Sequence, residues 1–217
     1  MSPPEPLRRF ACIGDVHCED RRLEATLGFL EHEELDAVLC VGDIADGTGD
    51  VDRCCSLLAE AGVLCVAGNH DRWLIAGTMR SLPQATLSLS AQSRAWLESL
   101  PPTRTFETVV GRLMLCHGVG VDDMAVLRPD TRGYGLQAVL GHIRQQTDLS
   151  VVLGGHTHER MVRSLGPFSF VNAGTLHRDF EPGFLVADLS HRELRFHAVA
   201  EDGTVTLADV HALPGAD

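Results

Sequence analysis

The sequence predicts an α/β protein, a four-layer βα sandwich in which two mixed β-sheets pack together and helices flank them. Two patterns support this prediction. In the first third of the chain, apolar runs alternate with segments of helical periodicity, which is typical of βαβ units and a parallel sheet. In the second half, apolar runs follow one another with little helix between them, which indicates a second sheet with antiparallel strands.

The first part of the chain contains three predicted strands separated by two predicted helices. The strands are the apolar runs at 10–13, 37–41 and 63–67. Between the first two strands, leucines recur at helical spacing over residues 20–34. A second helix is expected to run to about Ala61, with Asp50 as its N-cap and Gly62 at its end. This order predicts a parallel sheet.

The second part of the chain is predicted to contain two helices, a hairpin and a series of strands. Helices are expected at 91–100 and 135–146, and strands at 105–110, 112–116, 151–153, 168–171, 184–188, 194–199 and 205–210. Pro101 and Pro102 end the first of these helices, and Gly111 joins the first two strands into a hairpin. These strands predict the second sheet.

Length and composition predict one domain. The whole chain, residues 1–217, is long enough for one domain with an ample core, and its 44% of hydrophobic and 22% of charged residues are usual for a globular protein. Residues 1–8 are proline-rich and are expected to fray. Residues 119–149 are predicted to be a lid over the functional site or an insertion, and they suit an oligomer contact equally well.

Charge and cysteine usage bear on the partners and the location. A formal net charge of -12 argues against binding to extended nucleic acid or to an anionic membrane, but not against a small phosphorylated substrate. The odd number of cysteines and the lack of a Cys-x-x-Cys pair favour a reducing compartment. Cys12, Cys40 and Cys65 lie in predicted strands and are expected to be small buried hydrophobic residues. With no apolar signal core and no transmembrane-length run, a cytoplasmic location is expected.

Five short polar clusters each follow a predicted strand. They are Gly14-Asp15-Val16-His17, Gly42-Asp43, Gly68-Asn69-His70-Asp71, Cys116-His117-Gly118 and Gly155-His156-Thr157-His158. Ligands of open α/β sheets bind just beyond the carboxyl ends of the strands, so we expect the five clusters to meet at one edge. Aspartate, asparagine and histidine gathered in this way predict a site for two adjacent divalent metal ions.

The spacing of these residues suggests how two ions are shared. Asp43 is the natural bridging carboxylate, because two cations held close together need an anion between them. Asp15 and His17 lie two residues apart and can chelate one ion, whereas His156 and His158 can each reach a different one. Mixed histidine and carboxylate donors favour manganese and/or iron, with zinc, nickel or cobalt as alternatives.

The five clusters, taken in order, closely resemble those of the calcineurin-like metallophosphoesterase superfamily, and in particular its small prokaryotic phosphodiesterase branch. The resemblance covers about residues 10–190, and Asn172-Ala173-Gly174-Thr175 is similar to a further small-residue turn of this family. The family fold is a βα sandwich of two packed sheets, as the patterns of this chain predict. The chain lacks the Asp-Arg-Gly that follows the second motif in the protein Ser/Thr phosphatases, and with it their phosphate-binding arginine.

The resemblance implies a complete set of metal ligands. One ion would be held by Asp15, His17, Asp43 and His158, and the other by Asp43, Asn69, His117 and His156. The resemblance also implies that His70 is the catalytic histidine and that Asp71 orients it.

The residues themselves agree on His70, which directly follows the predicted ligand Asn69 and is therefore expected near the metals without binding them. For Asp71, an N-cap of the next helix is an equally good explanation. Arg72, Arg178 and His177 are candidate substrate-binding residues, although both arginines also suit ordinary ion-pair roles.

Together these residues predict a metal-dependent phosphoric ester hydrolase. A hydroxide that bridges two metal ions would attack phosphorus in line, and His70 would protonate the departing oxygen. The first prediction is a phosphodiesterase acting on a small or nucleotide-type substrate. The alternatives are a phosphomonoesterase of the same fold and a non-catalytic metal-binding scaffold, and no expected ligand is missing as the scaffold alternative would require.

Overall fold

The computed structural model describes residues 5–78, 80–143, 146 and 148–215. Its helices are α1 (Asp20–Leu30), α2 (Val51–Glu60), α3 (Asn69–Ile75), α4 (Ala91–Glu98) and α5 (Gly133–Gly141). Its strands are β1 (Arg9–Ile13), β2 (Ala37–Cys40), β3 (Leu64–Cys65), β4 (Thr103–Thr108), β5 (Gly111–Cys116), β6 (Leu149–Gly154), β7 (Met161–Ser164), β8 (Ser169–Asn172), β9 (Gly183–Asp188), β10 (Glu193–Val199) and β11 (Val205–Ala212).

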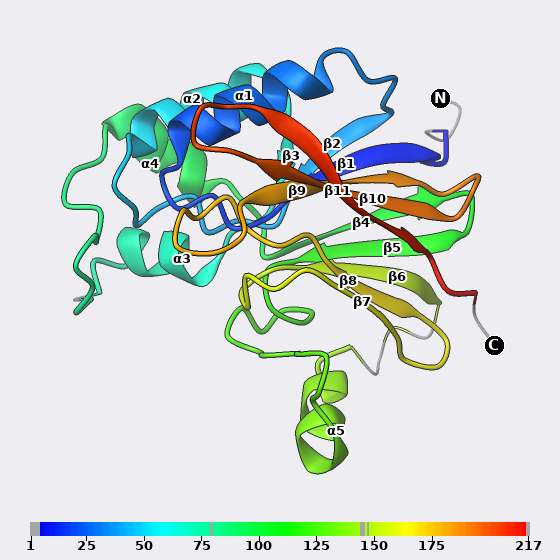
Figure 1. The fold of residues 1–217 in the computed structure, drawn as a ribbon. Coiled ribbons are helices and arrows are strands. Elements are labelled where there is room, and N and C mark those ends of the chain that lie inside the picture. The colour runs from blue at the N-terminus through cyan, green and yellow to red at the C-terminus, as the bar shows by residue number, and fades with distance from the viewer. Residues whose placement is uncertain (1–4, 79, 144–145, 147, 216–217) are drawn as a thin grey trace.

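The strands form two mixed sheets, as the sequence predicts (Figure 1). One sheet has six strands in the order β11-β10-β9-β1-β2-β3, and the other has five in the order β4-β5-β6-β8-β7. In the first sheet, β1 pairs in parallel with β2 and antiparallel with β9. In the second, β6 pairs in parallel with β5 and β8, while β4 and β7 pair antiparallel at the two edges.

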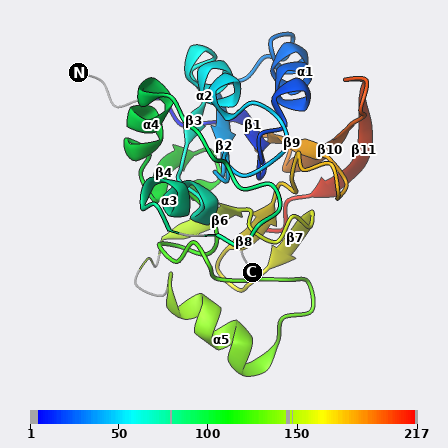
Figure 2. The ribbon, with the colours of Figure 1, turned by 90° about the vertical axis from the view of Figure 1, so that its left-hand side faces the viewer.

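Three apolar layers hold the elements together. Helices α1, α2 and α4 lie on one side of the six-stranded sheet (Figures 1 and 2), and Ala11 and Ile13 of β1 point into that layer. Phe10 and Cys12 of the same strand point into the layer between the two sheets. A third cluster covers the outer face of the five-stranded sheet, beneath α5 and the chain that leads to it. A strand buried on both faces explains why β1 is an uninterrupted apolar run.

Several predicted elements are confirmed in detail. Helix α2 begins where expected, because the Asp50 side chain accepts a hydrogen bond from the Arg53 backbone N–H at 3.0 Å. Gly62 follows the helix with a φ of +64°, a conformation that suits glycine. All seven cysteines are free and buried, which confirms the expectation for Cys12, Cys40 and Cys65.

Other boundaries differ from the prediction. Helix α1 ends at Leu30 rather than at residue 34, and the hairpin turns at residues 109–110, so that Gly111 is the first residue of β5. Strand β7 was not predicted, because its four residues contain only two apolar side chains and it pairs with β8 alone. The helix predicted at 135–146 is α5, which is shorter; residues 144, 145 and 147 lie outside the described part. Among the helices described, none has the length and apolar character needed to cross a membrane.

Candidate metal centre

The predicted ligands converge where the carboxyl ends of strands from both sheets meet. They follow β1, β2, β3, β5 and β6, and they are Asp15, His17, Asp43, Asn69, His117, His156 and His158. The pairs β1–β2 and β5–β6 are parallel, so their ends point the same way. The aspartates, Asn69, His17 and His117 are buried, whereas His156 and His158 are partly exposed. The cluster is therefore open on one side only.

The donor atoms fall into two groups that share one carboxylate. In each group, one donor atom from every residue lies within 4.8 Å of all the others. The first group is Asp15, His17, Asp43 and His158, and the second is Asp43, His117 and His156. The Asn69 Oδ1 atom joins the second group, at 2.9 Å from both His117 Nε2 and His156 Nδ1. This arrangement brings together the ligand sets that the sequence resemblance implies.

Backbone carbonyls orient two of the imidazoles. The Nδ1 atom of His17 lies 2.9 Å from the Asp46 carbonyl oxygen, and the Nδ1 atom of His117 lies 2.9 Å from the Val41 carbonyl oxygen. A carbonyl only accepts hydrogen bonds, so each Nδ1 carries a proton and donates it. The neutral form of each ring then presents the Nε2 lone pair to the centre, as a metal-ligating histidine does.

Polar atoms of the cluster converge on a common space, and two of them have no hydrogen-bond partner. The Nε2 atoms of His17 and His158 lie 3.1 Å apart, so only one of them can carry the proton between them. Asp15 Oδ2 and His158 Nδ1 are buried without a hydrogen-bond partner among the described residues. Buried polar atoms normally find partners, and convergent lone pairs without protons fit a bound cation. The donor set therefore fits divalent metal ions.

The electrostatics of the protein groups alone point the same way. Burial lowers the pKa of His17 to about 4 and that of His158 to about 3, so both rings are neutral and able to act as ligands. Burial raises the pKa of Asp15 to about 7. Burial also opposes a charge on His117, but Asp43 outweighs it and raises the pKa of His117 to about 10. The negative charge of the buried Asp43 carboxylate thus favours a positive charge beside it.

Backbone strain is concentrated in this cluster. Among the described residues, seven non-glycine residues have positive φ, and six of them belong to the metal centre or flank it: His17, Cys18, Asp43, Asp46, His156 and His158. Such conformations cost free energy and persist where the surrounding structure enforces them, often at functional sites. The backbone at Gly68 also lies very close to Asp43. A Cβ atom at this position would lie 2.1 Å from Asp43 Oδ1, so only glycine fits there.

His70 lies at the edge of the cluster and is held by Asp46. Its Nδ1 atom is 2.8 Å from Asp46 Oδ2, and its Nε2 atom is 4.0 Å from Asp43 Oδ2. Burial opposes a charge on His70, but the hydrogen bond to Asp46 and the charge of Asp43 raise its pKa. The contact with Asp46 therefore favours the protonated form of the His70 ring and leaves its Nε2 atom to face a substrate.

Asp71 does not contact the His70 ring, which differs from the role that the resemblance implies. Its two carboxylate oxygens accept hydrogen bonds from the backbone N–H groups of Ile44, Ala45 and Gly68. Asp71 is the third residue of α3, so it is not the N-cap either, which is Gly68. Sequence reasoning gave Asp46 no role. Its position three residues after Asp43, in the same loop, is the signal that the prediction missed.

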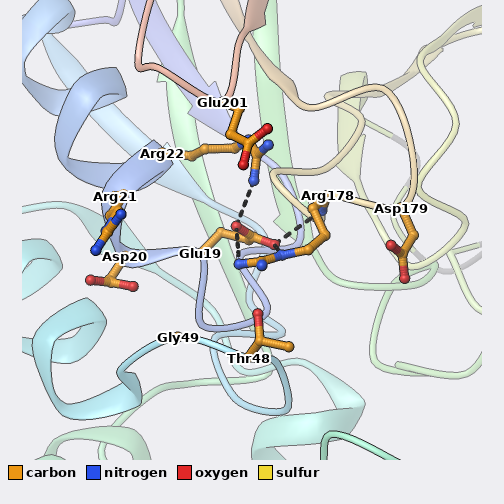
Figure 3. Close-up of a pocket in the computed structure, with 9 residues that line it drawn as sticks. All are labelled: Glu19, Asp20, Arg21, Arg22, Thr48, Gly49, Arg178, Asp179 and Glu201. Carbon is orange, nitrogen blue, oxygen red and sulfur yellow. Dashed lines mark hydrogen bonds and ion pairs between the residues drawn. The ribbon is translucent and has the colours of Figure 1, made fainter.

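The two candidate arginines are engaged with carboxylates. Arg72 binds Asp123 through Nε at 2.6 Å and Nη2 at 3.0 Å. Arg178 binds the buried Glu19 through Nε at 2.7 Å and Nη2 at 3.1 Å, and Arg22 binds the same carboxylate at 2.7 Å (Figure 3). The two pairs with Glu19 form beside a cavity of about 590 Å³ whose lining contains none of the metal ligands. Both arginines thus have the ion-pair role that the sequence left open.

A second cavity, of about 300 Å³, opens directly on the metal ligands. The residues that line it include His17, His70, His158 and His177, with Asp46, Asp179 and residues 82–84. The His177 ring lies 5.1 Å from the His17 ring and 5.9 Å from the His158 ring, measured between centroids. His177 is therefore the one of the three substrate-binding candidates that lines the cavity at the metal centre. Cys18, the residue after His17, is buried, and its Sγ atom contacts the Thr86 hydroxyl.

The fold and the donor set of this centre are those expected of the calcineurin-like metallophosphoesterase family. The model of the calcineurin-like phosphoesterase superfamily domain matches residues 9–192, and the chain belongs to this family. The resemblance that the five clusters suggest is confirmed.

Three comparisons show how far the similarity extends. An uncharacterized protein of Methanocaldococcus jannaschii, MJ0912, is 31% identical over 61 residues, which are 28% of this chain and 25% of that protein. A metallophosphoesterase from Sphaerobacter thermophilus has a TM-score of 0.63 at 22% identity and covers 88% of both chains. Vacuolar Protein Sorting 29 from Cryptosporidium parvum has a TM-score of 0.58 at 17% identity, over 96% of this chain and 100% of that one. At these identities, the two solved structures share the fold with this chain.

Proposed function

We propose that the protein is a two-metal-dependent phosphodiesterase that hydrolyses a small or nucleotide-type phosphate diester. The observation that carries this proposal is the position of Asp43, which belongs to both groups of convergent donor atoms. A carboxylate shared in this way suits two cations held close together, and such a pair is a common solution for phosphoryl transfer.

The chain's own residues would divide the work. Two bound divalent cations, with manganese and iron as first choices, would supply positive charge for the phosphoryl oxygens and acidify water for attack on phosphorus. The carbonyl oxygens of Val41 and Asp46 hold the His117 and His17 rings in the ligand tautomer. The buried Asp15 and Asp43 carboxylates provide the negative charge that retains the ions.

His70 would act as the general acid. Asp46 accepts a hydrogen bond from its Nδ1 atom at 2.8 Å, which favours the protonated ring and leaves Nε2 to donate to the departing oxygen. Because Nε2 lies on the cavity side, 4.0 Å from Asp43 Oδ2, that proton would be delivered beside the shared carboxylate. His177, from the opposite wall, is positioned to contact the substrate.

The lining of the cavity favours a diester over a monoester. No arginine is among the described residues that line the cavity at the metal ligands, and the two candidate arginines are paired elsewhere. A diester carries one negative charge, whereas a monoester carries up to two near neutral pH and needs more positive charge around it. The cavity volume of about 300 Å³ suits a small substrate.

The two alternatives keep some support. A phosphomonoesterase uses the same ligands and differs only in what surrounds the phosphate. A non-catalytic scaffold is favoured by the fold similarity to a vacuolar sorting protein. Against it stand the complete donor set and the oriented His70, since a scaffold has no use for either.

The deciding experiment compares two nitrophenyl esters. Metal-stripped protein is assayed with bis-p-nitrophenyl phosphate and p-nitrophenyl phosphate after addition of Mn²⁺, Fe²⁺, Zn²⁺, Ni²⁺ or Co²⁺, beside the Asp43→Asn variant. We expect metal-dependent hydrolysis that is faster for the diester and is lost in the variant. A faster monoester reaction would replace the diesterase with the phosphomonoesterase. Two ions bound per chain without turnover of either ester would favour the scaffold.

Two further properties belong to the same proposal. We infer a cytoplasmic enzyme formed by one domain, since seven reduced, buried cysteines suit a reducing compartment. We also infer that the described part of residues 119–149 acts as a lid, because Asp123 in this segment binds Arg72 of α3, which follows His70 and Asp71 in the sequence.

A further inference from the structure

The connection between α3 and α4, residues 76–90, forms one wall of the cavity beside His70. Residues 82–84 line that cavity together with His17, His70 and His158. The described part of this connection contains no helix or strand. Long irregular connections of this kind are either functional or loosely held, so what fixes this one matters.

One carboxylate, that of Asp46, anchors the connection at two points. The Thr86 backbone N–H donates to Asp46 Oδ1 at 2.7 Å, and the Thr86 hydroxyl accepts from the Asp46 backbone N–H at 2.9 Å. Arg80 Nη2 donates to Asp46 Oδ1 at 2.9 Å and to the Thr86 carbonyl at 3.2 Å. Residues 82–84 are thus held between two anchors on the same side chain.

The same carboxylate holds the His70 ring. Asp46 Oδ2 lies 2.8 Å from His70 Nδ1 and 2.8 Å from Arg80 Nε. The Arg80 side chain is only 8% exposed, so its charge is compensated by Asp46 rather than by water. An ion pair with low exposure fixes the carboxylate plane, and the plane of Asp46 determines where the His70 ring lies.

We propose that Arg80 is a positioning residue: through Asp46 it fixes the His70 ring and couples that ring to the wall formed by residues 82–84. Its consequence for the reaction rests on the proposed function. Loss of Arg80 leaves the Thr86 backbone N–H as the other anchor of the Asp46 carboxylate, on Oδ1, so the carboxylate plane is held less firmly and His70 delivers its proton less well. The effect is therefore largest for leaving groups that need a proton and small for those that do not.

The kinetic test uses Arg80→Gln and Arg80→Gly, with Arg94→Gln as the matched control on the exposed face of α4, where Arg94 pairs with Glu98. The holoenzymes are assayed on a series of aryl phosphodiesters whose leaving phenols differ in acidity. For Arg80→Gln we expect kcat to fall at least about tenfold for phenol, and much less for p-nitrophenol, with KM nearly unchanged. Guanidinium ion added to Arg80→Gly should restore part of the loss. An equal fall across the series, or a result like that of Arg94→Gln, would overturn the proposal.

A second readout does not need activity. The Trp73 ring lies 4.9 Å from the His70 ring between centroids, so its fluorescence reports the position of His70. The only other tryptophan, Trp96, is replaced by Phe in all variants. Arg80→Gln should change the Trp73 emission and speed proteolysis within residues 80–90, and Arg94→Gln should do neither. If no diester is hydrolysed by any form, the proposed function fails, while an unchanged Trp73 signal would still refute the positioning role.

Discussion

The metal ligands and the residues around the cavity rim are held in opposite ways. The ligands follow strand ends of two sheets, and Asp15, Asp43 and His117 are at most 1% exposed. The rim consists of Arg72 in α3 and Arg178 in the segment between β8 and β9. Neither arginine lines the cavity at the metal ligands, because they are paired with Asp123 and Glu19. The ligand cluster is therefore set by the fold, whereas the rim depends on contacts particular to this chain.

This difference suggests that the ligand cluster serves the reaction itself, whereas the rim affects which substrate is bound. The strained backbone at Asp43 and His156 comes directly after the buried ends of β2 and β6, which hold it in place. Nothing comparable fixes Arg72 or Arg178, which depend on single carboxylate partners. Substitutions in the ligand cluster should remove function outright, and substitutions at the rim should shift stability or substrate preference.

The largest effect is expected for Asp43→Asn. Asparagine tolerates the positive φ of +48° at this position, so the fold should survive. Even residues that only orient a metal ligand cost about 10–100-fold when mutated, so loss of the shared carboxylate should cost more than about 100-fold in kcat/KM. Metal binding by calorimetry and the rise of Tm with added Mn²⁺ should both weaken.

The control for this prediction is Asp209→Asn on the exposed strand β11. It should bind metal and raise its Tm with Mn²⁺ as the wild type does. Equal metal affinity in Asp43→Asn and Asp209→Asn would show that Asp43 does not connect two ions.

The next largest effect is expected for substitutions of His70 and Asp46, which should lower turnover, whereas substitution of Asp71 should lower stability. His70→Ala should keep both metal ions but lose about 10²-fold or more in turnover of diesters with poor leaving groups. Asp46→Asn should show the same dependence on the leaving group, more weakly. Asp71→Asn should instead lower stability by about 1–3 kcal/mol, because a buried amide satisfies the backbone donors of Ile44, Ala45 and Gly68 less well.

The measurements are kcat for an alkyl and a p-nitrophenyl diester, bound metal, and Tm. If His70→Ala hydrolyses an alkyl diester at the wild-type rate, His70 is not the general acid. A leaving-group dependence in Asp71→Asn instead of Asp46→Asn would restore the role that the family resemblance implies.

The same difference explains how much the sequence could predict. Strands such as β1 and β6 are apolar runs that end in polar clusters, so their position and the residues beyond them follow from the pattern. Edge strand β7 has little pattern of its own, and its existence depends on pairing with β8. The ends of α1 and α5 differ from the prediction because helix ends fray and carry a weaker local signal than helix interiors.

Within the site, the convergence of the predicted ligands could be predicted, because each of these residues follows a strand end. The partners of His70, Arg72 and Arg178 were not, because each lies far away in sequence: Arg178 is 159 residues from Glu19, and Arg72 is 51 from Asp123. A single sequence carries no signal for such pairs. Asp46 is the exception, since it lies only three residues after Asp43, in the loop that follows β2.

A smaller effect is expected for Glu19→Gln at the rim, and it should depend on pH. Burial opposes the charge on Glu19, but hydrogen bonds from Arg178 and the charge of Arg22 lower its pKa. A lowered pKa means stability that is present above the unfolded carboxyl pKa and is lost as pH falls through the folded pKa. Chemical denaturation at pH 7 should show a loss of about 1.5–3 kcal/mol.

The difference should vanish in acid, because protonated Glu19 and Gln are then alike. Glu201 is exposed and lines the same cavity of about 590 Å³ as Glu19. Glu201→Gln should therefore leave the free energy of unfolding nearly unchanged at either pH. A pH-independent loss in Glu19→Gln would mean that Glu19 contributes by packing and not by charge.

The smallest effect is expected for Arg72→Ala, and it tests the rim most directly. The Arg72 side chain is 51% exposed, and its bidentate pair with Asp123 is the contact by which α3 holds the segment that leads to α5. Exposed ion pairs contribute about 0.2–1 kcal/mol, so Tm should fall by a few degrees at most. KM for a small diester should change less than about threefold, because the guanidinium is bound to Asp123 and not to the phosphate.

The control is Asp123→Ala, which should have the same Tm and KM as Arg72→Ala, since both variants break one contact. If KM rises more than tenfold in Arg72→Ala but falls in Asp123→Ala, the arginine leaves its partner to bind substrate. The rim would then share in binding, and its separation from the ligand cluster would fail at this residue.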